Sequence, residues 1–522
     1  MITMQTATIF LDDQAPARYD DVVRVAHGAR LELSAALWRR IEDARLIVER
    51  IVADGVKAYG INTGLGALSD VVLGGEQLAE LSRRTLKSHA CGLGATLGLV
   101  ETRAIMCAQI INYSRGHSGI SAHVVRQLLD FLNLGLTPVV PMQGSVGYLT
   151  HMAHVGLTLI GLGELRFRGQ TMPAATALAM TGLAPVALAA KDGLSLVNGL
   201  PCMTGLLCLA LDHAKRLACW ADVIGAMSFE ALRGQLSAFD AEAMLQKPYP
   251  GQIHVAANLR ALLADSVVLR GGQGIRTQDA LSLRSMPQIH GAAREQITHA
   301  ERQINIELRS ANDNPLVFGD EHNYRVISQA NPHGEAMAMT ATTLSIAVAE
   351  LGGVAERRVD RLVNPHVSGL PPFLIAESGV NSGLMIVQYA AASLVAENKM
   401  LAQPMVLDNY ITSAQQEDHL SLGTPATLNL LRILSNVQKV LAIEYITAGQ
   451  GLYFYPEMEL GAGTRLALDH LRSKVPPLLE DRIVSHDIML ADYLIDDDRQ
   501  LAVFEAALSR KLWPPEQAAS AA

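Results

Sequence analysis

Cysteine is scarce in this chain of 522 residues. The five cysteines are Cys91, Cys107, Cys202, Cys208 and Cys219. Their number is odd, no two are spaced as C-x-x-C, and none follows Cys219. This pattern excludes a disulfide framework and a cysteine-based zinc site, and it indicates a reduced, cytoplasmic protein. Histidines and carboxylates also lack metal-ligand spacing along the chain, so the sequence predicts no metal site.

Positive charge and aromatic side chains are also in short supply. Lys and Arg total 42 against 51 Asp and Glu, which gives a net charge of -9, and aromatic residues make up 5%. These values argue against binding to nucleic acid or to an anionic membrane. Residues 1–12 show no basic segment followed by an apolar run, so we expect no signal peptide. The longest stretch without charge, 131–163, contains prolines and polar residues and does not predict a membrane span.

Hydrophobic residues reach 49% of the chain, enough for a large core. Apolar positions that recur every three or four residues predict long helices. The clearest cover 292–309, 334–363, 381–402 and 426–450, whereas strands are expected only at 6–11 and 315–318. The sequence therefore predicts a mainly α fold with a long central helical bundle and an N-terminal loop-and-helix region. We expect residues 1–200 to form the N-terminal loop region that carries active-site residues. Residues 201–522 should form the bundle and C-terminal helices, continuous with it as one structural unit.

Distinctive loops separate the predicted helices, and such loops often carry function. The glycine-rich stretch from Tyr59 to Gly66 could suggest phosphate binding, but no strand precedes it and no Lys-Ser/Thr follows it. A nucleotide site is therefore disfavoured.

Ten ordered motifs together resemble the aromatic amino-acid ammonia-lyase family, and its histidine ammonia-lyase branch in particular. They are YGINTGLG from Tyr59, SHACGLG from Ser88, GHSG from Gly116, GSVG from Gly144, LSLVNG ending at Gly199, SLR at Ser282, NDNPLVF from Asn312, ERR at Glu356, GLPPFL from Gly369 and QEDHLSLG from Gln416. The resemblance implies the mostly helical histidine/phenylalanine ammonia-lyase fold and a small-molecule substrate. It also implies a homotetramer whose active sites are shared between subunits.

One motif departs from the family pattern. The family forms an electrophilic methylidene-imidazolone from an Ala-Ser-Gly tripeptide after GSVG, whereas here Gly147 is followed directly by Tyr148. Tyr148 also stands where the family has Asp, Leu281 replaces a second catalytic Tyr, and Pro332 replaces a Phe. Two interpretations follow. Either the tripeptide is deleted and the enzyme has no prosthetic group, which these substitutions favour, or a matured chromophore is missing from the printed sequence.

A deletion would suit a quaternary ammonium substrate. Such a nitrogen has no lone pair to add to an electrophile, and it leaves as a neutral tertiary amine once a base removes the β-proton. Within the family, the chain thus resembles the ergothionase type of trimethylammonia-lyase. The resemblance implies elimination of trimethylamine from ergothioneine, or a related histidine betaine, to give thiolurocanate. The alternatives are a histidine ammonia-lyase or aminomutase that carries the methylidene-imidazolone, and a non-catalytic helical tetramer that binds a ligand or partner.

Matching positions imply roles at the reacting end of the substrate. Tyr59 is the candidate base, or alternatively a buried hydrogen-bonded tyrosine. Arg284 should pair with the substrate carboxylate, and Asn198 should donate to it or hold its partner. Gln278 and Asn331 are further candidates for substrate binding, with an intersubunit hydrogen bond as the alternative for each.

At the ring end, the resemblance implies that His89 and Glu417 hold an imidazole; the alternative for Glu417 is an ion pair at a helix end. Lys399 is a candidate partner for a thione sulfur. Tyr148 could bind trimethylammonium through a cation–π contact, or it could fill the volume of the missing tripeptide.

Overall fold

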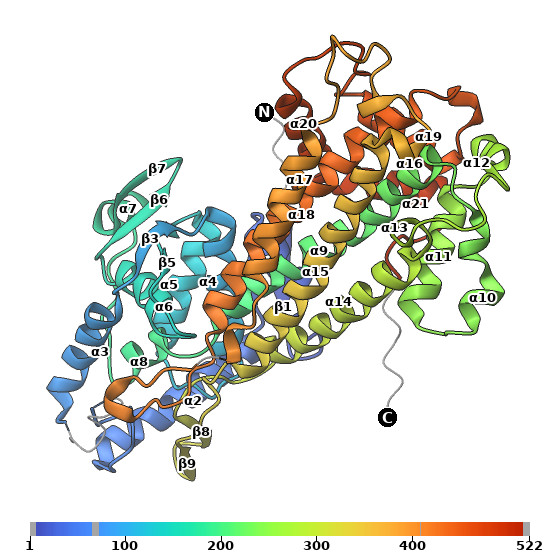
Figure 1. Ribbon diagram of the computed structural model, residues 1–522. Coiled ribbons are helices and arrows are strands. Elements are labelled where there is room, and N and C mark those ends of the chain that lie inside the picture. The colour runs from blue at the N-terminus through green and yellow to red at the C-terminus, as the bar shows by residue number, and fades with distance from the viewer. Residues whose placement is uncertain (1–6, 65–72, 408, 515–522) are drawn as a thin grey trace. The chain divides into compact units, whose positions relative to one another are not determined.

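The computed structural model describes residues 7–64, 73–407 and 409–514 (Figure 1). The chain divides into two compact units. Unit 1 comprises Met1–Asp212, Ala300–Thr342 and Pro404–Leu428; unit 2 comprises His213–His299, Thr343–Gln403 and Asn429–Ala522. Two later segments of the chain belong to unit 1 as well. The division expected after residue 200 stays a prediction.

Unit 1 carries shorter helices joined by loops. They are α1 Tyr19–Ala26, α2 Ala35–Asp54, α3 Gly75–His89, α4 Leu99–Tyr113, α5 Ala122–Leu134, α6 Thr150–Leu159, α7 Ala174–Thr181 and α8 Asp192–Val197, with the 3-10 turns η4 Met405–Leu407 and η5 Ser413–Gln415. Local signals set the ends of these helices. The Ser34 hydroxyl accepts a hydrogen bond from the Leu37 amide at the start of α2, and Gly55 ends that helix with a φ of 66°.

Unit 1 also contains several small sheets. Strand β1 Thr8–Leu11 pairs in parallel with β2 Arg30–Leu33, whereas all the other pairs are antiparallel. These others are β3 Leu93–Thr96 with β5 Pro141–Gln143, β4 Thr137–Pro138 with β6 Glu164–Phe167, β6 with β7 Gln170–Pro173, and the hairpin β8 Leu316–Gly319 with β9 Tyr324–Ile327. The two predicted strands correspond to β1 and β8, although Thr6 lies outside the described residues. Strands β4 and β5, with two and three residues, are too short to give a clear alternation of polar and apolar residues.

Four long helices run from residues of one unit into residues of the other. They are α9 Pro201–Ala231, α14 Met286–Leu308, α15 Glu335–Val363 and α18 Gly423–Leu452. Helix α15 begins within one residue of its predicted start. Helix α17 Val387–Leu401 begins later than residue 381, because a turn with Gly383 at a φ of +58° precedes it. The prediction of a mainly helical fold is confirmed.

Two helical stretches are long and apolar enough to cross a membrane by composition, Asp192–Ala231 and Glu335–Val363. The most apolar window of the first is 94% buried inside the chain, and that of the second is 61% buried. A core helix of a folded protein meets the same criterion. Packing of the core therefore accounts for their apolar character.

Unit 2 is built around the remaining parts of the long helices. Its other helices are α10 Ala241–Leu245, α11 Pro250–Leu262, α12 Val267–Gly272, α13 Leu281–Arg284, α16 Pro365–Ser368, α17, α19 Ala462–Arg472, α20 Val484–Ile495 and α21 Asp498–Ala507, with η2 Leu236–Phe239, η3 Pro372–Leu374 and η6 Glu457–Glu459. Arg358 and Glu444 form a fully buried bidentate ion pair there, with N–O distances of 2.6 and 2.9 Å. Such a pair fixes the register of α15 against α18 within this unit.

Candidate active site

The loop that follows α2 places Tyr59. The Asn62 side chain accepts a hydrogen bond from the Ala58 amide at 2.9 Å and donates one to the Val56 carbonyl at 2.9 Å. These bonds close the loop on itself and leave Tyr59 half-buried. Tyr59 lines a cavity of about 290 Å³ together with Pro315 and Tyr324. Of the predicted glycine-rich stretch, Leu65 and Gly66 lie outside the described residues.

Gly60 holds this loop against α8. Its φ is +65°, and a Cβ atom there would lie 2.5 Å from Leu194 Cδ2. Gly55 has nearly the same φ, +66°, but a Cβ atom there would meet nothing within 4 Å. Alanine at Gly55 would therefore suffer backbone strain alone, whereas alanine at Gly60 would suffer the same strain and a steric overlap.

We expect Gly55→Ala to lower the free energy of unfolding by about 1–2 kcal/mol, the cost of a left-handed backbone for alanine. Gly60→Ala should cost roughly 1–3 kcal/mol more, because its Cβ also displaces Leu194. Urea denaturation of both variants measures this difference. Equal losses of stability in the two variants would contradict the close packing of the loop.

A second loop, Gly144–Leu149, places Tyr148. The Leu422 amide donates to the Val146 carbonyl at 2.9 Å, and the Thr424 hydroxyl donates to the Gly147 carbonyl at 3.2 Å. Leu149 has a φ of 74° at the start of α6, a conformation that is strained for a residue with a side chain. The loop is thus tied to the segment that also carries Glu417.

The negative charge of Glu417 acts on the Tyr148 phenol. Burial, the negative charge of Glu417, a hydrogen bond to its carboxylate and the neighbouring Tyr59 together raise the pKa of the Tyr148 phenol well above its usual value. Tyr148 therefore stays protonated near neutral pH. Glu417 is half-buried and also accepts a hydrogen bond from the Thr412 hydroxyl at 3.2 Å. The structure thus brings three of the predicted residues, Tyr59, Tyr148 and Glu417, into one electrostatic group.

Asn198 is positioned by a buried acidic group. Its amide donates to Asp313 Oδ1 at 2.9 Å and to the Asn314 carbonyl at 3.2 Å. The other carboxylate oxygen of Asp313 accepts from Lys191 Nζ at 2.6 Å and from the Ser195 hydroxyl at 2.9 Å. Burial acts to raise the pKa of Asp313, but Lys191 and these hydrogen bonds outweigh it and hold that pKa below its usual range.

Sequence reasoning assigned no role to Lys191 or Asp313, although Asp313 lies in the NDNPLVF motif. The one signal in the sequence was the charge of Asp313 inside an otherwise polar turn. The contact itself could not be predicted, because 122 residues separate the two side chains along the chain.

His89 ends α3 and is half-buried. Its Nδ1 lies 2.8 Å from the Thr85 carbonyl, which can only accept, so Nδ1 carries a proton. In the neutral ring Nε2 is then left as an acceptor. Asn331 is exposed, and its amide donates to the Ala311 carbonyl at 2.9 Å.

The remaining predicted residues belong to unit 2. When the Gln278 side chain is oriented with its carbonyl oxygen toward Arg284, that oxygen accepts from the guanidinium at 2.9 Å. Gln278 is exposed and Arg284 half-buried at the end of α13, so the guanidinium keeps a route to solvent. Lys399 is exposed on α17. Leu281, which replaces the second family tyrosine, is 62% exposed.

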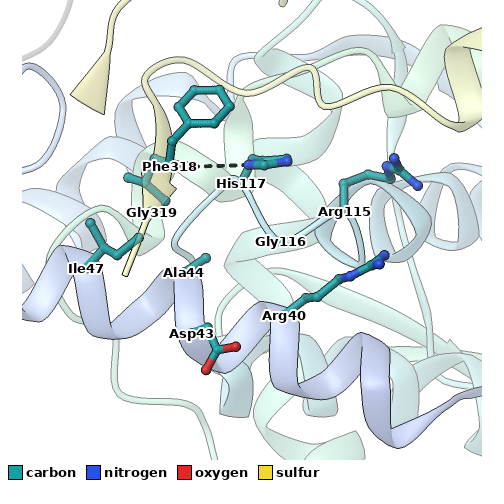
Figure 2. Close-up of a pocket in the computed structure, with 10 residues that line it drawn as sticks. Arg40, Asp43, Ala44, Ile47, Arg115, Gly116, His117, Phe318 and Gly319 are labelled. Atoms are coloured by element: carbon teal, nitrogen blue, oxygen red, sulfur yellow. Dashed lines mark hydrogen bonds between the residues drawn. The ribbon is translucent and has the colours of Figure 1, made fainter. Parts of the chain in front are cut away.

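A separate cavity of about 360 Å³ lies beside α2 (Figure 2). Figure 2 shows the Arg40 side chain extending from α2 toward that of Arg115, whereas the Asp43 carboxylate points away from both Arg115 and His117. His117 Nδ1 lies 3.1 Å from the Val317 carbonyl, so this histidine bonds to the backbone. None of the nine predicted site residues lines this cavity.

Known proteins resemble this chain over most of its length. The aromatic amino acid lyase family model matches residues 17–473. A histidine ammonia-lyase of Symbiobacterium thermophilum is 45% identical over 93% of this chain and 96% of its own. The histidine ammonia-lyase structure from Trypanosoma cruzi is 34% identical with a TM-score of 0.88, covering 98% of this chain and 100% of its own. The ergothioneine-degrading ergothionase of Treponema denticola, solved with desmethyl-ergothioneine sulfonic acid, is 28% identical with a TM-score of 0.89, covering 95% and 99%.

These relatives correct one expectation. Histidine and phenylalanine ammonia-lyases use a methylidene-imidazolone, which contradicts the prediction that no prosthetic group takes part. That prediction rested on the direct Gly147–Tyr148 link, which holds no Ala-Ser-Gly tripeptide. In the structure, a Cβ atom added to Gly147 would lie 2.5 Å from Ser421 Oγ, so this position is tightly enclosed. The residues present at this loop therefore do not supply the precursor of the group, and no step below is routed through it.

The match of the family model and the identity to histidine ammonia-lyases agree with the motifs found along the chain. They make the protein a carbon–nitrogen lyase that acts on a small molecule. The chain belongs to the aromatic amino acid lyase family, among its histidine ammonia-lyase-like members.

Proposed function

We propose that this lyase eliminates trimethylamine from ergothioneine, or from a closely related histidine betaine, to give thiolurocanate. The observation that carries the proposal is the group formed by Tyr148, Glu417 and Tyr59. The neutral phenol ring of Tyr148 suits a quaternary ammonium ion, which aromatic faces bind with about 0.5–2 kcal/mol, and the neighbouring Glu417 is left for the imidazole ring. The similarity to the ergothioneine-degrading ergothionase supports the same substrate class.

The elimination needs a base beside the β-carbon. We assign this role to Tyr59, which lines a cavity and is held by the closed loop after α2. The phenolate takes the β-proton, the C–H electrons form the Cα–Cβ double bond, and the C–N bond breaks. Trimethylamine leaves as a neutral molecule, so the positive charge of the substrate is lost in the same step. The products are trimethylamine, the acrylate and the proton held by Tyr59.

Binding at the two ends of the substrate orients it for this step. We assign the carboxylate to Arg284, supported by Gln278, Asn198 and Asn331. We assign binding of the imidazole ring to His89 and Glu417, and binding of the sulfur to Lys399. Arg284, Gln278 and Lys399 belong to unit 2 and the other residues to unit 1. We propose that the protein is a homotetramer and that its active sites combine residues of several subunits.

A histidine ammonia-lyase activity is the second candidate. It is favoured by the identity of 45% to a histidine ammonia-lyase and by the imidazole-binding pair expected from His89 and Glu417. The two candidates share the ring-binding end. They differ in the leaving group, trimethylamine in one and ammonia in the other.

One assay separates the two candidates. Purified protein is incubated with ergothioneine, with histidine betaine and with histidine, while released trimethylamine, released ammonia and the ultraviolet absorbance of the acrylate are followed. We expect trimethylamine and an acrylate from a betaine and no ammonia from histidine. Ammonia and urocanate from histidine alone would establish the second candidate. Silence toward all three compounds would indicate a non-catalytic protein.

A further inference from the structure

Three side chains from two distant segments of unit 1 converge on one point. His333 and Glu335 lie at the start of α15, and His419 lies in the segment before α18. Each offers one ligand atom, and these atoms all lie within 4.8 Å of one another. The sequence predicted no metal site, because 86 residues separate the two histidines along the chain.

The two histidines already have nearly the spacing of metal ligands. His333 Nε2 and His419 Nδ1 are 3.1 Å apart, with ring centroids 5.1 Å apart. Two nitrogens bound at about 2.0–2.1 Å to a tetrahedral Zn²⁺ lie roughly 3.3 Å from each other. An ion could therefore replace the single proton that the two nitrogens share, with little movement of either ring.

The carboxylate supplies an independent observation. Glu335 Oε2 is buried and has no hydrogen-bond partner among the residues that the structure describes. A buried carboxylate oxygen ordinarily has a donor or a cation beside it. Glu335 also lies in the first turn of α15, where the helix dipole favours a negative charge. A bound dication would satisfy this oxygen directly.

We propose that His333, Glu335 and His419 bind a divalent transition-metal ion of the zinc type. Two neutral imidazoles and one carboxylate form a three-ligand set that leaves a fourth position for water. The ion would connect the start of α15 to the segment 409–422, and so would restrain the loop that carries Glu417. The assignment does not depend on which substrate the enzyme uses.

Co²⁺ serves as a spectroscopic probe for the site. Untagged wild-type protein is stripped with a chelator, dialysed and titrated with Co²⁺, while visible absorbance and calorimetric heat are recorded. We expect one ion per chain and the intense visible bands of a tetrahedral site, which added Zn²⁺ should abolish by competition. Failure of the wild-type protein to bind Co²⁺ or Zn²⁺ would overturn the proposal, whatever the result of the substrate assay.

Variants locate the site. His419→Ala and Glu335→Gln should weaken binding by more than the roughly 10- to 100-fold that loss of an outer partner costs. His322→Ala, in the exposed turn between β8 and β9, is the matched control and should bind as the wild type does. Circular dichroism checks the fold of each variant. If His419→Ala does not fold, Glu335→Gln decides alone, and unchanged affinity in that variant would place the ion elsewhere.

Discussion

Replacing Tyr59 by Phe should lower the turnover of ergothioneine by about 10²–10⁴-fold, the usual contribution of a positioned general base. The phenyl ring keeps its place in the cavity that Tyr59 lines, whereas the oxygen that takes the β-proton is lost. The Michaelis constant should change much less than kcat, since the ring and carboxylate ends of the substrate are held elsewhere. Steady-state release of trimethylamine measures both constants.

Tyr324→Phe is the matched control for this variant. Tyr324 lines the same cavity on strand β9 and is half-buried, as Tyr59 is. Its hydroxyl has no part in the proposed step, so turnover should stay within a few-fold of the wild type. Both variants should unfold at nearly the wild-type urea concentration. Full activity in Tyr59→Phe would show that another group removes the proton.

Lys191→Met should destabilise the protein by about 3–5 kcal/mol, because it leaves the Asp313 carboxylate buried without its cation. Lys191 is fully buried and the side chain of Asp313 is 4% exposed, with 2.6 Å between the charged atoms. Methionine keeps most of the volume of lysine, so the loss reports the charge rather than a cavity. Urea denaturation followed by circular dichroism measures the free energy of unfolding.

An exposed ion pair provides the comparison. In Arg84→Met the partner Glu80 stays in water, with side chains of the wild-type pair 75% and 49% exposed. The cost there should remain below about 1 kcal/mol. Equal losses in the two variants would show that the Lys191–Asp313 pair contributes no more than a surface contact.

The pH dependence of the Lys191–Asp313 pair has a definite sign. The folded protein holds the pKa of Asp313 below its unfolded value of about 3.9. The stability that ionised Asp313 contributes is therefore fully present above about pH 4. It is lost as the pH falls through the lower, folded pKa. In Lys191→Met the free energy of unfolding should therefore fall less on acidification than it does in the wild type.

The sequence by itself determined the helical class, the positions of most long helices and the family. Helix periodicity is a local property, so α15 could be placed within one residue of its start. The loop motifs from Tyr59, Gly144 and Gln416 likewise pointed to the residues of the candidate site. Short strands such as β4 escaped prediction, since two residues give no periodic pattern.

Only the tertiary structure decided which of these residues meet. The position of Tyr148 near Glu417 depends on hydrogen bonds between loops that lie far apart along the chain. The pairing of Lys191 with Asp313 and the meeting of His333 with His419 likewise join segments distant in sequence. Such contacts arise from the packing of the whole unit, which buries charges and brings side chains together that no local pattern connects.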